Sequence, residues 1–243
     1  MRKISLIWAV FCAVVLLGSA LRNPVAQQAD ASVLLPAASK YIALTFDDGP
    51  KRGTTDVLLD GLKERGISAT FFLVGDQIAG KEDLVRRMHA EGHQVGNHTW
   101  SHAALLDAPE ETILCEIQKT EDLLSEILGG SGYWVRPPYG LIRANDREAV
   151  AVPLVKWSLD PRDWEHRNAQ TVLQAILKAT EANSIILLHD IYPSSVEAAL
   201  RSADALQEAG YLLVTVEELL ALNGVEPRAG TMYRNGEGAT AWE

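Results

Sequence analysis

Acids and histidines recur in this sequence at the ends of short apolar segments. Two adjacent acids, Asp47 and Asp48, follow the first such segment, and His98 and His102 follow the third. Two histidines and one carboxylate can give a metal three protein ligands and leave further positions open, which is typical of a catalytic metal site. The second carboxylate can then act as a base on a water molecule. The pattern therefore favours metal-assisted hydrolysis.

Further ionisable residues follow the later apolar segments. Arg136 ends the fourth, Asp163 follows the fifth and His189 follows the sixth. His189 could serve as an acid, which completes the set that hydrolysis of an amide or ester uses. Each feature alone is weak, because residues 47–50 could form a plain turn and either histidine of the pair could be a surface or capping residue. The prediction of metal-assisted hydrolysis depends on their occurring together, each at the end of an apolar segment.

The elements that would position these residues alternate between strand and helix. We expect seven strands, at residues 41–46, 69–74, 94–97, 133–136, 152–158, 185–188 and 211–214. Amphipathic segments lie between them, such as the stripe of Ile113, Ile117 and Leu124. Apolar strands separated by amphipathic helices are typical of a parallel sheet, whose carboxyl ends bring side chains to one face. The sequence therefore predicts an α/β fold, either a compact barrel or an open sheet.

Composition excludes several classes of protein. The 243 residues include 22 basic and 32 acidic side chains, which give a net charge of -10. Hydrophobic residues make up 47% of the chain and charged residues 22%, ordinary values that exclude a disordered protein. The acidic balance argues against nucleic acid as a partner, because such proteins carry a basic stripe. Two cysteines are too few for a disulfide scaffold.

The N-terminal segment has the pattern of an export signal. Residues 1–3 are basic at two positions, and residues 4–21 are almost entirely apolar and uncharged, as in a signal peptide or an uncleaved anchor. We expect an extracytoplasmic protein, either secreted or tethered to the outer face of the cytoplasmic membrane. The expected division is a signal peptide or anchor at 1–31, a tether at 32–38, a catalytic domain at 39–222 and a polar tail at 223–243.

Five segments of the chain form an ordered series of motifs. They are Thr-Phe-Asp-Asp-Gly at 45–49, His-Thr-Trp-Ser-His at 98–102, Arg-Pro-Pro-Tyr-Gly at 136–140, Asp-Pro-Arg-Asp-Trp at 160–164 and Leu-Leu-His at 187–189. This series resembles the five motifs of the NodB-homology polysaccharide deacetylases, carbohydrate esterase family 4. The resemblance covers about residues 39–222, and five motifs in this order are highly specific. It implies a distorted (β/α) barrel, which agrees with about seven parallel strands.

The resemblance implies a role for the residues of the first three motifs. Asp48, His98 and His102 would bind a divalent metal, most often zinc and sometimes cobalt or another transition metal. Asp47 would be the catalytic base. Arg136 would pair with Asp47 and hold it in place.

The resemblance also implies an acid and a substrate pocket. His189 would protonate the leaving amine, and Asp163 would pair with His189 and raise its pKa. The backbone N–H of Tyr139 would help to stabilise the oxyanion. Trp164 and Leu187 would line the pocket for the acetyl methyl group, although Trp164 could instead be a plain core residue. The residues expected to bind substrate are Tyr139, Trp164, Leu187 and Pro138.

One segment departs from the family pattern. Between Gly140 and Trp157 the family usually has a full helix, whereas residues 144–151 allow about two turns. We therefore expect this βα unit to be shortened, which alters one wall of the substrate groove.

The resemblance implies a metal-dependent N-deacetylase of a cell-wall polysaccharide, acting on N-acetylglucosamine, with peptidoglycan as the expected substrate. Tyr139 favours glucosamine, because family members that act on muramic residues tend to carry arginine there. Chitooligosaccharides, poly-N-acetylglucosamine and acetyl-xylan are alternative substrates. A non-haem iron oxygenase uses the same two histidines and carboxylate, but a base and an acid at Asp47 and His189 count against it. A glycan-binding protein without catalysis is a third alternative. We expect a monomer.

Overall fold

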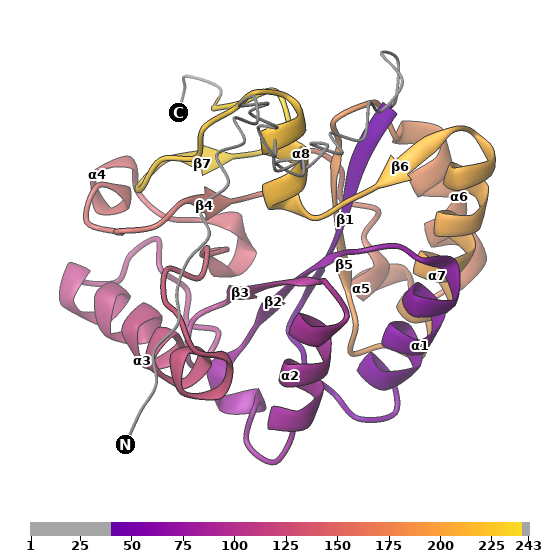
Figure 1. Cartoon of the computed structure of the whole chain (residues 1–243). Helices are drawn as coiled ribbons and strands as arrows, with labels where there is room; N and C mark the ends of the chain where they lie inside the picture. Colours follow the sequence, from indigo (N-terminus) through magenta and orange to yellow (C-terminus); the bar gives the residue numbers. More distant parts are fainter. Residues whose placement is uncertain (1–39, 240–243) are drawn as a thin grey trace, which may run out of the picture. The chain divides into compact units, whose positions relative to one another are not determined.

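A parallel sheet forms the centre of the computed structural model, which describes residues 40–239 (Figure 1). The expected signal or anchor at 1–31 and the tether at 32–38 lie outside the described residues. The sheet has the order β3–β2–β1–β5, and β6 also pairs with β1. The strands are β1 (Lys40–Asp47), β2 (Thr70–Leu73), β3 (Gln94–Asn97), β5 (Ile185–His189) and β6 (Tyr211–Leu213). Every pairing among them is parallel.

A second, two-stranded sheet and a series of single bridges close the sheet into a ring. The second sheet pairs β4 (Leu154–Val155) with β7 (Met232–Tyr233) in parallel. Val135 bridges Asn97 at the end of β3 to Leu154 in β4, and Asn235 bridges back to Ser184 beside β5. Ladder hydrogen bonds are few along this arc, so the barrel is distorted. The α/β fold with a parallel sheet is confirmed.

The expected strands at 133–136 and 152–158 are much reduced. Only Val135 of the first takes part in a bridge, and only Leu154 and Val155 of the second form a strand. Pro137 and Pro153 lie beside these short pairings, and proline has no N–H to donate to a ladder. The apolar pattern therefore located the segments correctly but overestimated their length.

Helices pack around the outside of the sheet. They are α1 (Thr55–Arg65), α2 (Glu82–Ala90), α3 (Glu110–Leu128), α4 (Ala144–Arg147), α5 (Asp163–His166), α6 (Ala169–Ala179), α7 (Pro193–Glu208) and α8 (Val216–Leu222). Neighbours in the series α5, α6, α7, α1, α2 and α3 pack against one another. The predicted stripe of α3 is buried at Ile113, Ile117 and Leu124. In residues 40–239, no helix has the length and apolar character needed to cross a bilayer.

The C-terminal segment contributes a strand that the sequence analysis does not predict. Residues 223–243 are expected to be a polar tail, yet β7 pairs with β4, and the N–H of Lys156 donates to the carbonyl of Tyr233 at 2.7 Å. Tyr233 is only 2% exposed and packs in a core cluster with Trp134 and Val155. The expectation of a tail is therefore wrong for these residues. Two apolar residues in a polar segment show no periodicity that a sequence pattern could reveal.

We expect Tyr233→Ala to lower the free energy of unfolding by about 3–5 kcal/mol, the usual cost of truncating a buried aromatic side chain. Urea unfolding of the full chain measures the change. Tyr233→Phe is the matched control, since it keeps the ring and loses only the hydroxyl that accepts from the N–H of Arg228 at 3.0 Å. Equal stability of Tyr233→Ala and the wild type would contradict a structural role for β7.

Candidate active site

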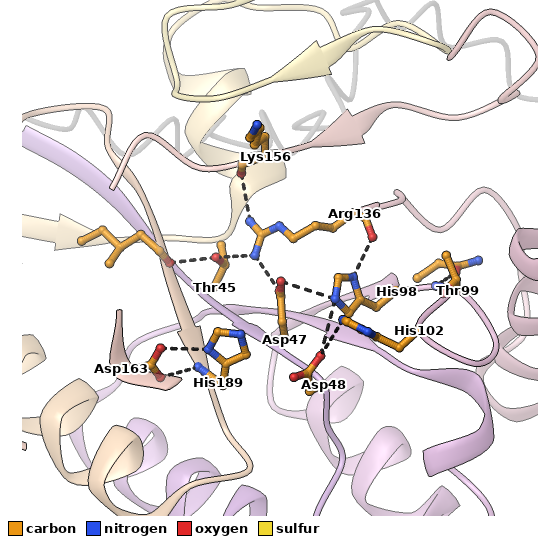
Figure 2. Close-up of polar contacts among 12 residues, drawn as sticks. Thr45, Asp47, Asp48, His98, Thr99, His102, Arg136, Lys156, Asp163 and His189 are labelled. Carbon is orange, nitrogen blue, oxygen red and sulfur yellow. Dashed lines mark hydrogen bonds and ion pairs between the residues drawn. The ribbon is translucent and has the colours of Figure 1, made fainter. Parts of the chain in front are cut away.

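Most of the acids and histidines singled out in the sequence meet in one cavity at the carboxyl ends of β1, β3 and β5 (Figure 2). The cavity has a volume of about 350 Å³. It is lined by Asp47, Asp48, His98, His102, Tyr139, Trp157, Asp160, Trp164, Leu187 and His189. Adjacent parallel strands end at the same edge of the sheet, which is why residues far apart in sequence come together here.

Several residues of the site and of the loops beside it have backbone conformations that residues other than glycine rarely adopt. The φ angles are 71° at Asp48, 66° at Thr99, 58° at His102 and 59° at Tyr139. Such left-handed conformations are strained for residues other than glycine, and they cluster at functional sites. Part of the support is local, since the side chain of Asn97 accepts a hydrogen bond from the Thr99 N–H at 2.9 Å. In these conformations the side chains of Asp48, His102 and Tyr139 line the cavity at the ends of the strands.

Asp48, His98 and His102 form a group that could hold a metal ion. Their potential ligand atoms all lie within 4.8 Å of one another. Asp48 Oδ1 lies 3.6 Å from His98 Nε2 and 3.4 Å from His102 Nε2. Although it is buried, this oxygen has no hydrogen-bond partner in residues 40–239. A buried oxygen without a donor, facing two imidazole nitrogens, fits a divalent cation.

The surroundings of His98 prepare its ring to act as a ligand. Its Nδ1 lies 2.6 Å from the carbonyl oxygen of Arg136. Because a carbonyl only accepts, Nδ1 carries the proton and the lone pair of Nε2 is left for the cavity. Burial lowers the pKa of His98 to about 3, which keeps the ring neutral, the form that binds metals.

Asp47 has the environment of a catalytic base. Figure 2 shows it between Arg136 and His98, with Oδ1 accepting from Arg136 Nη1 at 2.7 Å and Oδ2 lying 3.7 Å from His98 Nε2. Burial raises the pKa of the Asp47 carboxyl above its usual value, although the charge of Arg136 opposes this shift. A carboxylate with a raised pKa is a stronger base than an exposed one, and so accepts a proton more readily.

Arg136 is a fully buried cation whose donors are directed by its neighbours. Besides Asp47, Nη1 donates to Thr45 Oγ1 at 2.8 Å, and Nη2 donates to the carbonyl of Lys156 at 3.0 Å. The guanidinium also lies 4.2 Å from the centre of the Phe72 ring. Arg136 does not line the cavity. Its contacts instead hold Asp47 in one orientation, in agreement with the expected pairing.

His189 lies on the opposite wall and pairs with Asp163, as expected. Asp163 is fully buried; its Oδ1 lies 2.8 Å from His189 Nδ1, and its Oδ2 accepts from the His189 backbone N–H at 2.8 Å. Burial alone would lower the pKa of His189, but the hydrogen bond and charge of Asp163, together with the charges of Asp47 and Asp48, outweigh it and raise that pKa to about 9. His189 is therefore protonated at neutral pH and can give up a proton.

Three of the four residues expected to bind substrate line the cavity, and one does not. Tyr139 and Trp164 line the cavity and are 60% and 43% exposed, and Leu187 is a buried part of the wall. The exposure of Trp164 excludes the alternative that it is a plain core residue. Pro138 is buried and does not line the cavity. Trp157 is a wall residue that the sequence analysis missed, although an aromatic side chain at the end of an expected strand is a usable signal.

Asp190 packs closely against Gly49, in the loop that follows Asp47 and Asp48. It is fully buried and accepts a hydrogen bond from Thr55 Oγ1. A Cβ atom at Gly49 would lie 2.5 Å from both carboxylate oxygens of Asp190, so this close approach requires glycine. Burial raises the pKa of Asp190 to about 7.

Comparisons with known proteins indicate the family of this chain. A model of the polysaccharide deacetylase family matches residues 35–152. The peptidoglycan-N-acetylmuramic acid deacetylase PdaC of Bacillus subtilis is 40% identical over 180 residues, which are 74% of this chain and 38% of PdaC. This chain therefore matches well under half the length of that relative. A peptidoglycan-N-acetylglucosamine deacetylase of Bacillus cereus is 35% identical over 191 residues, which are 76% of this chain and 70% of that protein.

A solved structure gives the same result for the fold. A family 4 acetyl xylan esterase from Clostridium thermocellum, in complex with a cobalt ion, is 31% identical and superposes with a TM-score of 0.76. The match covers 81% of this chain and 98% of that one. The sequence match covers 70% of the Bacillus cereus protein and the structural match covers 98% of the Clostridium thermocellum chain, so the chain belongs to the polysaccharide deacetylase family.

Proposed function

We propose that this protein is a metal-dependent polysaccharide deacetylase that hydrolyses the N-acetyl groups of N-acetylglucosamine in a cell-wall glycan, with peptidoglycan as its substrate. One observation carries the proposal: a possible metal group and a base and acid pair, Asp47 and His189, line the same cavity. Two of the relatives described above are named as peptidoglycan deacetylases, which supports the choice of glycan.

Asp48, His98 and His102 are the residues that would hold the metal. The donor set of two imidazole nitrogens and one carboxylate suits zinc, and also cobalt or another transition metal. When bound, the ion supplies a Lewis acid that polarises the acetyl carbonyl and lowers the pKa of water.

The other residues of the site act on protons and on orientation. Asp47 accepts the proton of the attacking water, while Arg136 holds the carboxylate in place. The backbone N–H of Tyr139 donates to the oxygen that becomes negative as the carbonyl is attacked. His189 gives its proton to the nitrogen of the leaving amine, so that the sugar departs as a neutral amine. Trp164 and Leu187 enclose the acetyl methyl group.

We expect Asp163→Asn to move the alkaline limb of the pH profile of kcat/KM to lower pH by about 1–3 pH units, the usual effect of one neighbouring charge. His189 works as an acid only below its pKa of about 9, so activity falls as pH rises through that value. Removal of the Asp163 charge lowers the pKa and brings the fall to lower pH. Glu165→Gln, in the same helix, is the control and should leave the limb in place. An unmoved limb in Asp163→Asn would contradict the pairing.

We propose further that the deacetylated sugar is glucosamine. Tyr139 favours glucosamine, whereas PdaC is named for N-acetylmuramic acid. Acetate release from chitooligosaccharides, poly-N-acetylglucosamine, acetyl-xylan and peptidoglycan distinguishes the substrates, and analysis of the digested peptidoglycan identifies the deacetylated sugar. Acetate release from glucosamine units is the expected result. If the metal-loaded protein releases acetate from none of these glycans, the proposed function is wrong, and oxygen consumption with iron would then point to an oxygenase.

The proposal places the protein outside the cytoplasm as a monomer. The support for the location is the basic start and the uncharged apolar run at residues 4–21, together with the cell-wall substrates for which the relatives are named. Fractionation of cells and size-exclusion chromatography of the full chain test these two points.

A further inference from the structure

Trp157 lines the active-site cavity without a role in the proposed hydrolysis. It lies outside the five motifs, between the third at 136–140 and the fourth at 160–164. The base, the acid and the three candidate metal ligands line the cavity, and so do four side chains with large apolar surfaces: Tyr139, Trp157, Trp164 and Leu187. The methyl group of an acetamide is apolar and is favoured where it contacts apolar surface. These four residues are therefore the ones that an acyl group can lie against.

The four residues lie at different depths in the cavity. Tyr139 and Trp164 are 60% and 43% exposed, which places them at the mouth. Leu187 is only 3% exposed, and Trp157 is partly buried and packs against a core cluster. Leu187 precedes His189 by two residues on β5, so the two side chains share a face of the sheet and Leu187 lies one step deeper. Leu187 and Trp157 thus form the inner end of the apolar wall.

The indole ring of Trp157 is held in place by its neighbours. A Cβ atom at Gly140 would lie 2.9 Å from Cη2 and 3.1 Å from Cζ3 of the ring, so the ring edge rests directly on the Gly140 backbone. The Arg136 guanidinium lies 5.7 Å from the ring centre, within the range of a cation–π contact. Segment 141–156 connects Gly140 to Trp157 and is shortened as expected, since α4 has only four residues. Because closely packed side chains have little room to move, the ring forms a fixed wall.

We propose that Trp157 determines the length of the acyl group that the enzyme accepts, by closing the inner end of the cavity behind the acetyl methyl group. This inference rests on the proposed function. Each further methylene of a propionyl or butyryl group would meet the indole ring and displace the carbonyl carbon from its place beside Asp47. Trp157 therefore determines specificity and takes no part in proton transfer.

The test is Trp157→Phe in the full, zinc-loaded chain, since phenylalanine keeps an aromatic wall but has a smaller ring system. The substrates are chitosan tetraoses whose amines all carry acetyl, propionyl or butyryl groups, and the appearance of free amine gives kcat/KM. One additional methylene in a closed pocket corresponds to a change of about 10–200-fold. We expect the ratio of kcat/KM for propionyl to that for acetyl to rise at least about tenfold in Trp157→Phe. Trp157→Leu, with a still smaller side chain, should extend the gain to butyryl groups.

Trp134→Phe is the matched control. Trp134 is 9% exposed, belongs to the core cluster against which Trp157 packs, and does not line the cavity. Its replacement should leave the preference among the three acyl groups unchanged, and thermal unfolding compares the stability of the variants. A purely structural role of Trp157 would lower kcat/KM equally for all three substrates. That result, or the same change of preference in Trp134→Phe, would overturn the inference.

Binding of simple hydroxamates decides the inference separately from turnover. Acetohydroxamate, propionohydroxamate and butyrohydroxamate share one zinc-chelating group and differ only in the length of the acyl chain. Calorimetry with the zinc-loaded protein should show that the wild type binds acetohydroxamate at least about tenfold more tightly than butyrohydroxamate, and that Trp157→Phe loses this preference.

That loss of preference supports the role of Trp157 even if the wild type hydrolyses none of the glycans and the proposed function fails. Equal affinity of the wild type for all three hydroxamates, or an unchanged preference in Trp157→Phe, overturns the inference even if the wild type deacetylates peptidoglycan.

Discussion

Asp47→Asn is expected to lower kcat for acetate release by about 10²–10⁴-fold, the range associated with loss of a general base, while metal content stays unchanged. Asparagine keeps the shape of the side chain but cannot accept the proton of water. Asp47 is not one of the three residues grouped as possible metal ligands, so its loss should spare the ion. Acetate release together with metal analysis of the same sample measures both quantities.

The control for this result is Asp48→Asn, which changes the neighbouring carboxylate. It should lose metal as well as activity, because Asp48 Oδ1 faces both histidines. Asp47→Asn also leaves the buried Arg136 without its ion pair, at a cost of about 3–5 kcal/mol in stability. Thermal unfolding of each variant therefore shows whether the lost turnover comes from unfolding. Full activity of folded Asp47→Asn would exclude Asp47 as the base.

Removal of the metal is expected to abolish acetate release, and added zinc or cobalt should restore it. Charge stabilisation by a metal is worth several kcal/mol in the transition state, so we expect a loss of roughly 10³-fold or more. His98→Ala should show the same loss without recovery at moderate metal concentration, because one of the three candidate ligands is then missing. Chelation, dialysis and readdition of metal to the full chain provide the measurement.

His89→Ala is the matched control for His98→Ala. His89 lies on α2 with an exposed side chain and does not line the active-site cavity, so its replacement should change neither metal content nor activity. Undiminished hydrolysis by protein shown to contain no metal would contradict the metal-dependent mechanism. Loss of metal from His89→Ala as readily as from His98→Ala would contradict the assigned ligands.

Local sequence patterns predicted the order of the elements and most of the ionisable residues that line the cavity. The expected strand at 94–97 coincides with β3, and the stripe of α3 is buried as predicted. These features depend on which side chains along one short segment are apolar, and such periodicity is visible in the sequence. The ionisable residues at the strand ends could be grouped because parallel strands all finish at one edge.

The tertiary structure alone decided how the barrel closes and how the site is held. β7 consists of two residues, too few to show a period. Its partner β4, and the Ser184 that bridges to the nearby Asn235, are both distant in sequence. The positive φ angles of Asp48, His102 and Tyr139 oppose local preference and persist because the surrounding structure imposes them. Arg136 reaches Asp47 and the Lys156 carbonyl only in the folded core.

Sequence determines what each short segment can bury and which chemistry its side chains can perform. Which distant segments meet depends on closure of the barrel, a long-range packing event whose outcome is not encoded in the periodicity of any one segment.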